Sequence, residues 1–133
     1  MKIFICGSKM CANLPEKAKK YITCLCHKNH SILIGDCYGI DLSVQQHLYK
    51  SGYQNVVVYT ACNKARNNVG RWQEISVSTD KTGFEAHREK DKAMIADCDC
   101  GIAIWDGISK GTRMNTEDLK SSGKRVVIYS TVS

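Results

Sequence analysis

The sequence predicts a single-domain α/β fold of the Rossmann-like, doubly wound kind, in which a mostly parallel sheet has helices on both faces. Short apolar runs alternate with helical patterns along all 133 residues, and this alternation is typical of such sheets. The first run is almost continuously apolar, as expected for a central strand that is buried on both faces. Turns containing Gly, Ser and Asp follow three of the runs, at the edge where these folds bind ligands.

Five apolar runs are expected to form strands, because each is short and is bounded by turn residues. They occupy residues 2–6, 31–34, 55–59, 101–105 and 125–129. Helical patterns cover residues 14–27, 40–51, 84–97 and the stretch that follows the loop at 106–112 and ends at Gly123. Asn13 is the expected N-cap of the first helix, with Pro15 in its first turn, and Gly52 is expected to stop the second helix.

Residues 60–83 form the irregular part of the chain. They contain CNKARNNVGRW and a polar STDKTG segment. So long a connection is uncommon in a compact domain, and we therefore expect a binding loop or lid here. Its candidate ligand-binding residues are Arg66, Asn67 and Trp72. Trp72 suits stacking on a base or packing of the lid, whereas a solvated loop is the alternative for the other two.

Composition indicates an ordinary globular protein, with 43% apolar and 24% charged residues. The opening MKIFICGSKM has the pattern of a strand rather than a signal peptide, and no apolar run is long enough for a bilayer, so we expect a cytoplasmic protein without membrane contact. Reduced thiols are then expected for the eight cysteines. No metal is expected, because Cys24, Cys26, His27 and His30 lack zinc-site spacing.

Three predicted strand ends carry residues that suggest a ligand site. The carboxyl ends of parallel strands lie along one edge, so these turns should meet. They contribute Gly7, Ser8 and Lys9, then Gly35, Asp36, Gly39 and Asp41, then Asp106, Gly107, Ser109, Lys110, Gly111 and Thr112. The last group precedes a helix, where free N–H groups and the helix dipole favour an anion such as phosphate. The simpler alternatives are turn glycines at Gly107 and Gly111 and a first-turn helix acid at Asp41.

These segments resemble the SLOG superfamily, the Rossmann-like group that includes the Lonely Guy phosphoribohydrolases, the DNA-processing DprA proteins and ligand-sensing domains of bacterial defence systems. The resemblance covers nearly the whole chain and rests on ICGS at 5–8, GDCYGIDLSVQQHL at 35–48 and EKDKAMIADCDCGIAIWDGISKGT at 89–112, with ARNNVGRW at 65–72 as a looser match. It implies a nucleotide-type ligand along the sheet edge. The base and ribose would lie near Gly7 and Ser8, and the phosphate near Gly107, Ser109, Gly111 and Thr112.

The chain departs from the Lonely Guy enzymes where they carry catalytic residues. Asn115 stands at the position of their catalytic Glu, and Lys90 at the position of their Arg. An Asn cannot act as an acid, a base or a carboxylate nucleophile near neutral pH. An enzyme would need another carboxylate close to the sugar, for which the candidates are Asp106, Asp91 and Glu85. Binding is therefore favoured over catalysis.

Arg88 and Asn115 complete the set of candidate ligand-binding residues. The resemblance implies that Arg88 and Lys90 approach the ligand from the helix at 84–97. They are two positions apart and cannot face the same way on a helix. We therefore expect at most one of them to contact the ligand and the other to lie at the surface.

The favoured function is binding of a nucleotide or a nucleotide-derived, ADP-ribose-like metabolite, as a sensor, carrier or sequestering protein that requires no cofactor. The alternative is a nucleotide N-glycosidase, either a phosphoribohydrolase or a deoxyribosyltransferase-like enzyme. A nucleic-acid partner is not favoured, because the basic residues are scattered along the chain. The net charge of +6 nevertheless leaves single-stranded DNA binding as a third hypothesis. The resemblance also implies a homodimer or higher homo-oligomer.

Overall fold

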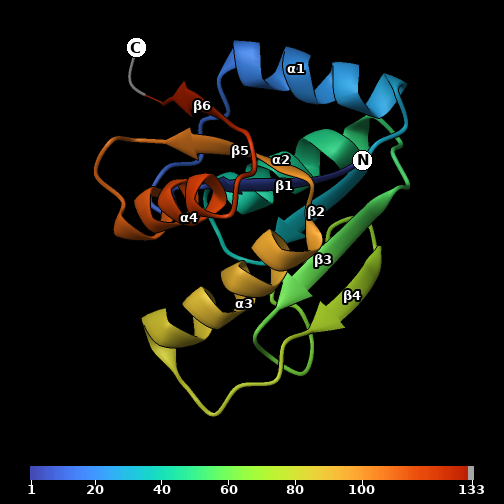
Figure 1. Ribbon diagram of the computed structural model, residues 1–133. Coiled ribbons are helices and arrows are strands. Elements are labelled where there is room, and N and C mark those ends of the chain that lie inside the picture. Colours follow the sequence, from blue (N-terminus) through green and yellow to red (C-terminus); the bar gives the residue numbers. More distant parts are fainter. Residues whose placement is uncertain (132–133) are drawn as a thin grey trace.

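The chain folds into a parallel sheet with helices on both faces, as predicted (Figure 1). The structure is a computed structural model and describes residues 1–131. Within these residues the strands are β1 (Lys2–Gly7), β2 (Ser31–Gly35), β3 (Val56–Thr60), β4 (Gln73–Ser76), β5 (Cys100–Trp105) and β6 (Val126–Ser130). The helices of the same part of the chain are α1 (Glu16–His27), α2 (Ile40–Lys50), α3 (Gly83–Asp97) and α4 (Lys110–Ser121).

The order of the strands locates the functional edge. It is β4-β3-β2-β1-β5-β6, and every described pair is parallel. The chain builds outward from β1 to β4 and then crosses back to place β5 on the other side of β1. The order in which strands are added to the sheet therefore reverses between β1 and β5, although the strands stay parallel. Ligands of open α/β sheets bind at such a switch point, outside the carboxyl ends of the strands.

Two apolar clusters form the core, one on each face of the sheet. Because successive side chains of a strand point to opposite faces, Ile3 and Ile5 of β1 belong to the cluster covered by α1 and α2. Phe4 and Cys6 belong to the cluster covered by α3 and α4. None of the helices formed by residues 1–131 is long and apolar enough to cross a lipid bilayer.

Residues 60–83 were expected to be irregular, but they contain the edge strand β4. This strand pairs with β3 in parallel, with Gln73 opposite Val57. Its four residues, QEIS, are only partly buried and lack the apolar run that marks the other strands. Just before it, Trp72 is 7% exposed and belongs to the core, where its indole N–H donates a hydrogen bond to the Tyr53 carbonyl at 2.9 Å.

The first helix begins at Glu16, later than predicted. Pro15 occupies the N-cap position with extended backbone, at φ −60° and ψ 145°, so the prediction of Asn13 as the cap was wrong. The residue before a proline is disfavoured in the helical region. Leu14 is therefore held outside the helix, where its side chain is buried in the core. The predicted stop at Gly52 is confirmed by its positive φ of 70° directly after α2 and its C-cap.

Substitution of Gly7 by Ala should destabilise the fold. A Cβ at this position would overlap the Ile40 side chain and lie 2.8 Å from the Ile104 carbonyl oxygen. Overpacking of this kind costs about 1–3 kcal/mol, which urea unfolding would measure. Gly111→Ala is the matched control, because its Cβ would meet only the Phe84 ring, at 3.8 Å. Equal unfolding midpoints for the two variants would contradict the close approach at Gly7.

Candidate nucleic-acid interface

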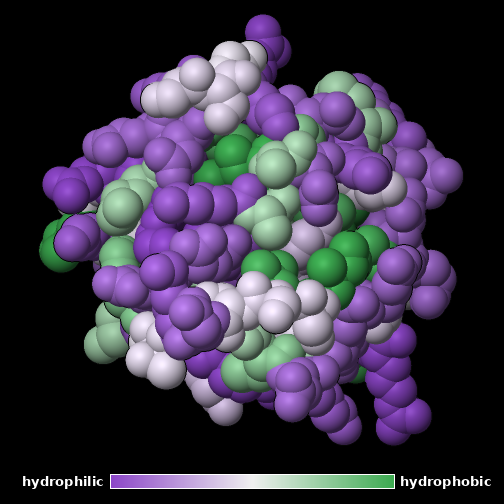
Figure 2. Space-filling model, turned by 60° about the horizontal axis from the view of Figure 1, so that its bottom comes forward, coloured by the Kyte–Doolittle hydropathy of each residue, from purple (hydrophilic) through white to green (hydrophobic). Residues whose placement is uncertain are grey.

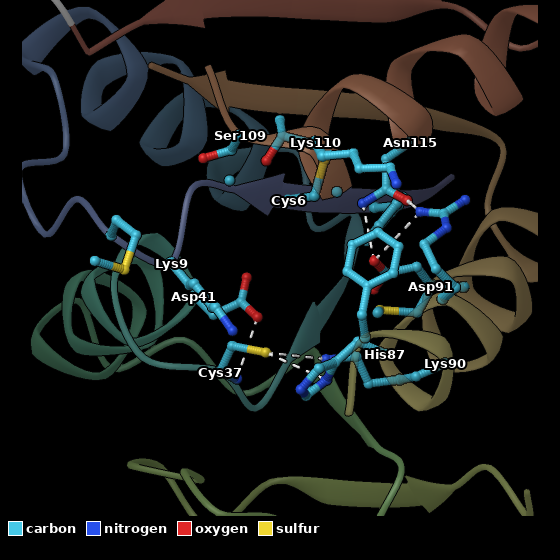
Figure 3. Close-up of a pocket in the computed structure, with 18 residues that line it drawn as sticks. Cys6, Lys9, Cys37, Asp41, His87, Lys90, Asp91, Ser109, Lys110 and Asn115 are labelled. Atoms are coloured by element: carbon cyan, nitrogen blue, oxygen red, sulfur yellow. Dashed lines mark hydrogen bonds and ion pairs between the residues drawn. The ribbon is translucent and has the colours of Figure 1, made fainter. Parts of the chain in front are cut away.

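A cavity of about 260 Å³ opens at the carboxyl edge of the sheet, between α3 and α4 (Figure 3). Among its apolar lining residues, Phe4 and Cys6 of β1 and Met94 of α3 are almost fully buried. The remaining lining residues come from four stretches of the chain: Gly7, Lys9, Met10, Cys37, Asp41, Phe84, His87, Arg88, Lys90, Asp91, Ser109, Lys110, Gly111, Thr112 and Asn115. The three predicted turns therefore meet at one place.

The turn between β5 and α4 is shaped by Asp106. Its Oδ1 accepts the backbone N–H groups of Ile108 and Ser109 at 2.9 and 2.8 Å, and its Oδ2 accepts the Ser109 hydroxyl at 3.0 Å. The Asp106 N–H in turn donates to the Ser8 hydroxyl at 3.1 Å. These hydrogen bonds, first among them that from the Ser109 N–H, hold the pKa of Asp106 below its ordinary value. Asp106 thus holds the turn and does not line the cavity.

The first turn of α4 faces the cavity with unused hydrogen-bond donors. Lys110, Gly111 and Thr112 all line the cavity. Their backbone N–H groups find no acceptor within residues 1–131, as expected for the first turn of a helix. This turn also carries no acidic residue. The positive end of the helix dipole is therefore available to an anion.

An aromatic ring lies beside this helix end. Phe84, at the start of α3, is 44% exposed, and the Lys110 ammonium lies over it, 5.2 Å from the ring centroid. A cation held over an aromatic face in this way is stabilised by the ring quadrupole. The cavity mouth thus combines a positive charge, N–H groups without an acceptor and an exposed ring.

Further apolar side chains surface on the loops at the same edge. Met10 follows β1, Tyr38 follows β2 and Ile108 follows β5, and all three are well exposed. Figure 2 shows one face of the molecule, on which apolar side chains emerge in separate groups from a mostly hydrophilic surface. Exposed apolar and aromatic groups beside a cavity are typical of a binding surface.

Asp36 is the centre of an ionic network behind the cavity. Its fully buried carboxylate accepts hydrogen bonds from the Thr60 hydroxyl at 2.7 Å and from the backbone N–H of Arg66 at 3.0 Å. The Arg66 guanidinium pairs with it at 3.2 Å. Burial alone would raise the pKa of Asp36, but the Arg66 and Thr60 hydrogen bonds outweigh burial and lower it to about 2. Asn67 binds the Asp36 carbonyl at 2.9 Å, so residues 60–72 are fastened to the end of β2.

Lys90 links this network to the cavity. It is 1% exposed, and its ammonium lies 3.5 Å from the Asp36 carboxylate. A Cβ on Gly35 would lie 2.9 Å from that ammonium and 2.5 Å from the Asp41 carboxylate, so only glycine leaves room for both. Burial opposes the Lys90 charge, but Asp41 and Asp91 outweigh it and raise the pKa of Lys90 above its ordinary value.

Arg88 joins α3 to α4. It donates hydrogen bonds to Asn115 and Asp118, and it also lies 3.6 Å from Asp91. Arg88 is 6% exposed, so the expectation that one of Arg88 and Lys90 lies at the surface was wrong. The two side chains do leave α3 in different directions, one toward α4 and the other toward β2. Both nevertheless line the cavity, because α3 packs against α4 on one side and against the sheet on the other.

Two carboxyl groups with displaced pKa values line the inner cavity. Asp41 is buried, and burial raises its pKa to about 7 although Lys90 acts in the opposite direction. Its Oδ2 accepts the Cys37 N–H at 3.2 Å. Burial also raises the pKa of Asp91. His87 has its pKa lowered to about 4, first by burial and then by Lys90, so it is neutral near pH 7.

The structure brings some of the predicted site residues to the cavity and leaves others behind it. Those that line it are Gly7, Lys9, Asp41, Arg88, Ser109, Lys110, Gly111, Thr112 and Asn115, together with the candidate acid Asp91 and with Lys90, which the resemblance also implied. Those that do not line it are Ser8, Gly35, Asp36, Gly39, Arg66, Asn67, Trp72, Asp106 and Gly107, together with Glu85. Most of the second group shape the turns or the ionic network, whereas Trp72 packs in the core and Glu85 is exposed.

Seven lining residues were missed by sequence reasoning: Phe4, Cys6, Met10, Cys37, Phe84, His87 and Met94. Three of them follow a signal that the sequence carries. Phe84, His87 and Met94 fall on one stripe of α3 with Arg88 and Asp91, at the spacing of one helix face. Across residues 1–131 no group of three or more His, Cys, Asp or Glu side chains could hold a metal ion.

The site and topology define an open parallel α/β sheet with a cavity at its switch point. DNA processing protein A from Helicobacter pylori, whose solved structure is described for a unique single-stranded DNA binding mode, has a similar fold, with a TM-score of 0.70 at 16% sequence identity. The match covers 96% of this chain and 64% of that chain. No family model and no curated protein matches the chain. The fold is thus Rossmann-like and similar to that of DprA.

This finding corrects the expected ligand. The hypothesis of a nucleotide-derived metabolite, with an N-glycosidase as its alternative, is overturned because the protein with the similar fold binds single-stranded DNA. The expectation against a nucleic-acid partner is wrong for the same reason. Its premise was that the basic residues are scattered, but the fold brings Lys9 and Lys110 to one cavity. Arg88 and Lys90 line the same cavity but are buried and paired with acidic side chains. Homo-oligomer formation stays a prediction.

Substitution of Asp41 by Asn should change how stability depends on pH. The pKa of Asp41 is about 7 in the fold and about 3.9 in an unfolded chain, so the folded state holds the extra proton between these values. Rising pH therefore removes stability in this window, by at most about 1.4 kcal/mol per pH unit. The stability of Asp41→Asn relative to the unmodified protein should grow from about pH 4 to about pH 7 and then level off.

Urea unfolding at several pH values would measure this difference. Titration of His87 changes stability with pH in the opposite direction, because its pKa of about 4 in the folded state lies below its unfolded value. His87 is present in both proteins, so its contribution cancels in the difference. Parallel stability curves would show that Asp41 does not titrate as its burial requires.

Proposed function

We propose that the chain binds single-stranded nucleic acid at the carboxyl edge of its sheet, where the cavity opens. The observation that carries this proposal is the meeting of the open first turn of α4 with the Phe84 ring and the Lys110 ammonium at the cavity mouth. These groups match the two repeating parts of a single strand, which are a phosphate and an unstacked base.

The phosphate would lie at the first turn of α4. The N–H groups of Lys110, Gly111 and Thr112 are free there, and a helix N-terminus with free N–H groups is a ready-made anion site. Lys9 and Lys110 line the same cavity and would neutralise neighbouring phosphates. The net charge of +6 would also attract the negatively charged strand over longer distances.

The base would lie on the aromatic and apolar side chains of the edge. Phe84, at the start of α3, and Tyr38, on the loop after β2, are exposed rings at this edge. Bases of single strands stack on such rings whatever the identity of the base. In a duplex the base faces are stacked on each other and are not accessible. This arrangement therefore favours a single strand over a duplex.

The similar fold of DNA processing protein A supports the proposal, because that protein binds single-stranded DNA. The segments at 5–8, 35–48 and 89–112 support a place for this chain within the SLOG superfamily, on its DprA side. This chain spans less than the whole of the Helicobacter protein, so the proposal concerns strand binding alone.

Fluorescence anisotropy with a labelled thymidine strand of about 15 nucleotides tests the function. The unmodified protein should bind it more tightly than a duplex of equal length, and the affinity should fall as salt rises from about 50 to about 200 mM. Phe84→Ala should weaken binding about tenfold, because loss of one stacked base costs about 1–3 kcal/mol. Lys110→Gln should weaken binding and reduce the salt slope by about one.

Lys20→Gln provides the matched control. Lys20 is exposed on α1, which covers the opposite face of the sheet, so its removal lowers the net charge equally without touching the cavity mouth. Equal losses for Lys20→Gln and Lys110→Gln would show only nonspecific attraction. Equal affinity for single strand and duplex, or no binding at low salt, would refute the proposal.

A further inference from the structure

The inner cavity carries acceptors that no residue of the described chain uses. Asp41 is 8% exposed, and only its Oδ2 has a partner within residues 1–131, the Cys37 N–H. Its Oδ1 points into the open space, as Figure 3 shows. This oxygen is accessible from the cavity, since Arg88 Nε alone is a buried side-chain polar atom without a partner in residues 1–131. A ligand that enters the cavity can therefore donate an N–H to it.

Asp91 faces this space from the opposite wall, on α3 (Figure 3). Its Oδ2 accepts the Asn115 side-chain N–H at 3.1 Å and lies 3.6 Å from Arg88. Its Oδ1 has no partner in the part of the chain that the structure describes. The inner cavity therefore offers one unused carboxylate oxygen on each of two walls.

The charges around these carboxyl groups show what the inner cavity can accept. Lys90 of α3 faces both of them, Asp36 and Cys37 lie behind Asp41, and Cys6 of β1 lies between the walls. Two acidic groups disfavour a phosphate here, so the phosphate belongs to the α4 end. A neutral group with N–H donors is the complement of these acceptors.

We propose that Asp41 and Asp91 make the cavity selective for a base with an exocyclic amino group. This inference rests on the proposed function and adds base preference to it. Guanine, adenine and cytosine each present an amino group, and Asp and Glu accept hydrogen bonds from such groups. Guanine presents two neighbouring donors, an imino and an amino N–H, and is the best match to a carboxylate.

Thymine and uracil are the bases that this site rejects. Each has one N–H, flanked by two carbonyl oxygens. Above pH 7, where Asp41 is ionised because its pKa is about 7, a carbonyl oxygen facing its carboxylate leaves both acceptors without a donor. A polar site discriminates strongly against a ligand that lacks the group it is built to bind. The cavity of about 260 Å³ is smaller than sites for drug-sized molecules, which suits a single base.

The test compares four labelled strands of about 15 nucleotides, one of thymidine alone and three with a single central dA, dC or dG. Anisotropy titrations with the full chain give the ratio of dissociation constants for each pair. The three substituted strands should bind about tenfold more tightly than thymidine alone, with dG the tightest. Asp41→Asn should bring the dG ratio close to one, because an amide offers a donor as well as an acceptor.

Asp91→Asn provides a second variant, with the same expected loss of preference, should Asp41→Asn fold poorly. Glu89→Gln is the matched control, because it removes a carboxylate from α3 outside the cavity and should retain the full ratio. Equal binding of all four strands, or a dG preference that survives both Asp variants, would overturn the base preference while strand binding stands. Absence of salt-dependent binding to every strand would instead overturn the proposed function.

Discussion

The buried ion pair between Lys90 and Asp36 is the interaction on which the site depends. Both side chains are almost fully removed from water, and a buried charge without a partner would be strongly destabilising. Asp36 also binds Thr60 and Arg66, so the pair connects α3 to the ends of β2 and β3. The wall of the cavity is thereby held against the sheet by charge rather than by apolar contact alone.

The fold class could be predicted because the strands are short apolar runs separated by helices of ordinary length. β4 could not be, because an edge strand of four partly buried residues has no pattern that separates it from a loop. The start of α1 was misplaced by two residues, where the restriction imposed by Pro15 on Leu14 outweighed the apolar pattern.

The site could be predicted in outline only. Parallel strands bring their carboxyl ends together, so the turns after β1, β2 and β5 had to meet. The cavity lining on α3 depends instead on how that helix packs. The orientation of α3 about its axis turns His87 and Asp91 toward the cavity. These residues lie within the helix, where no turn motif in the sequence points to them. Burial of Arg88 was missed because its partners, Asn115 and Asp118, lie on another helix. The sequence contains no pattern that indicates this contact between the two helices.

The Lys110 ammonium lies over the Phe84 ring, 5.2 Å from the ring centroid. Under the proposed function, a base that stacks on this face of the ring takes the place of the ammonium. The displaced charge is then free to pair with the phosphate of the same nucleotide. Stacking of the base and neutralisation of its phosphate are therefore coupled in that proposal through one lysine side chain.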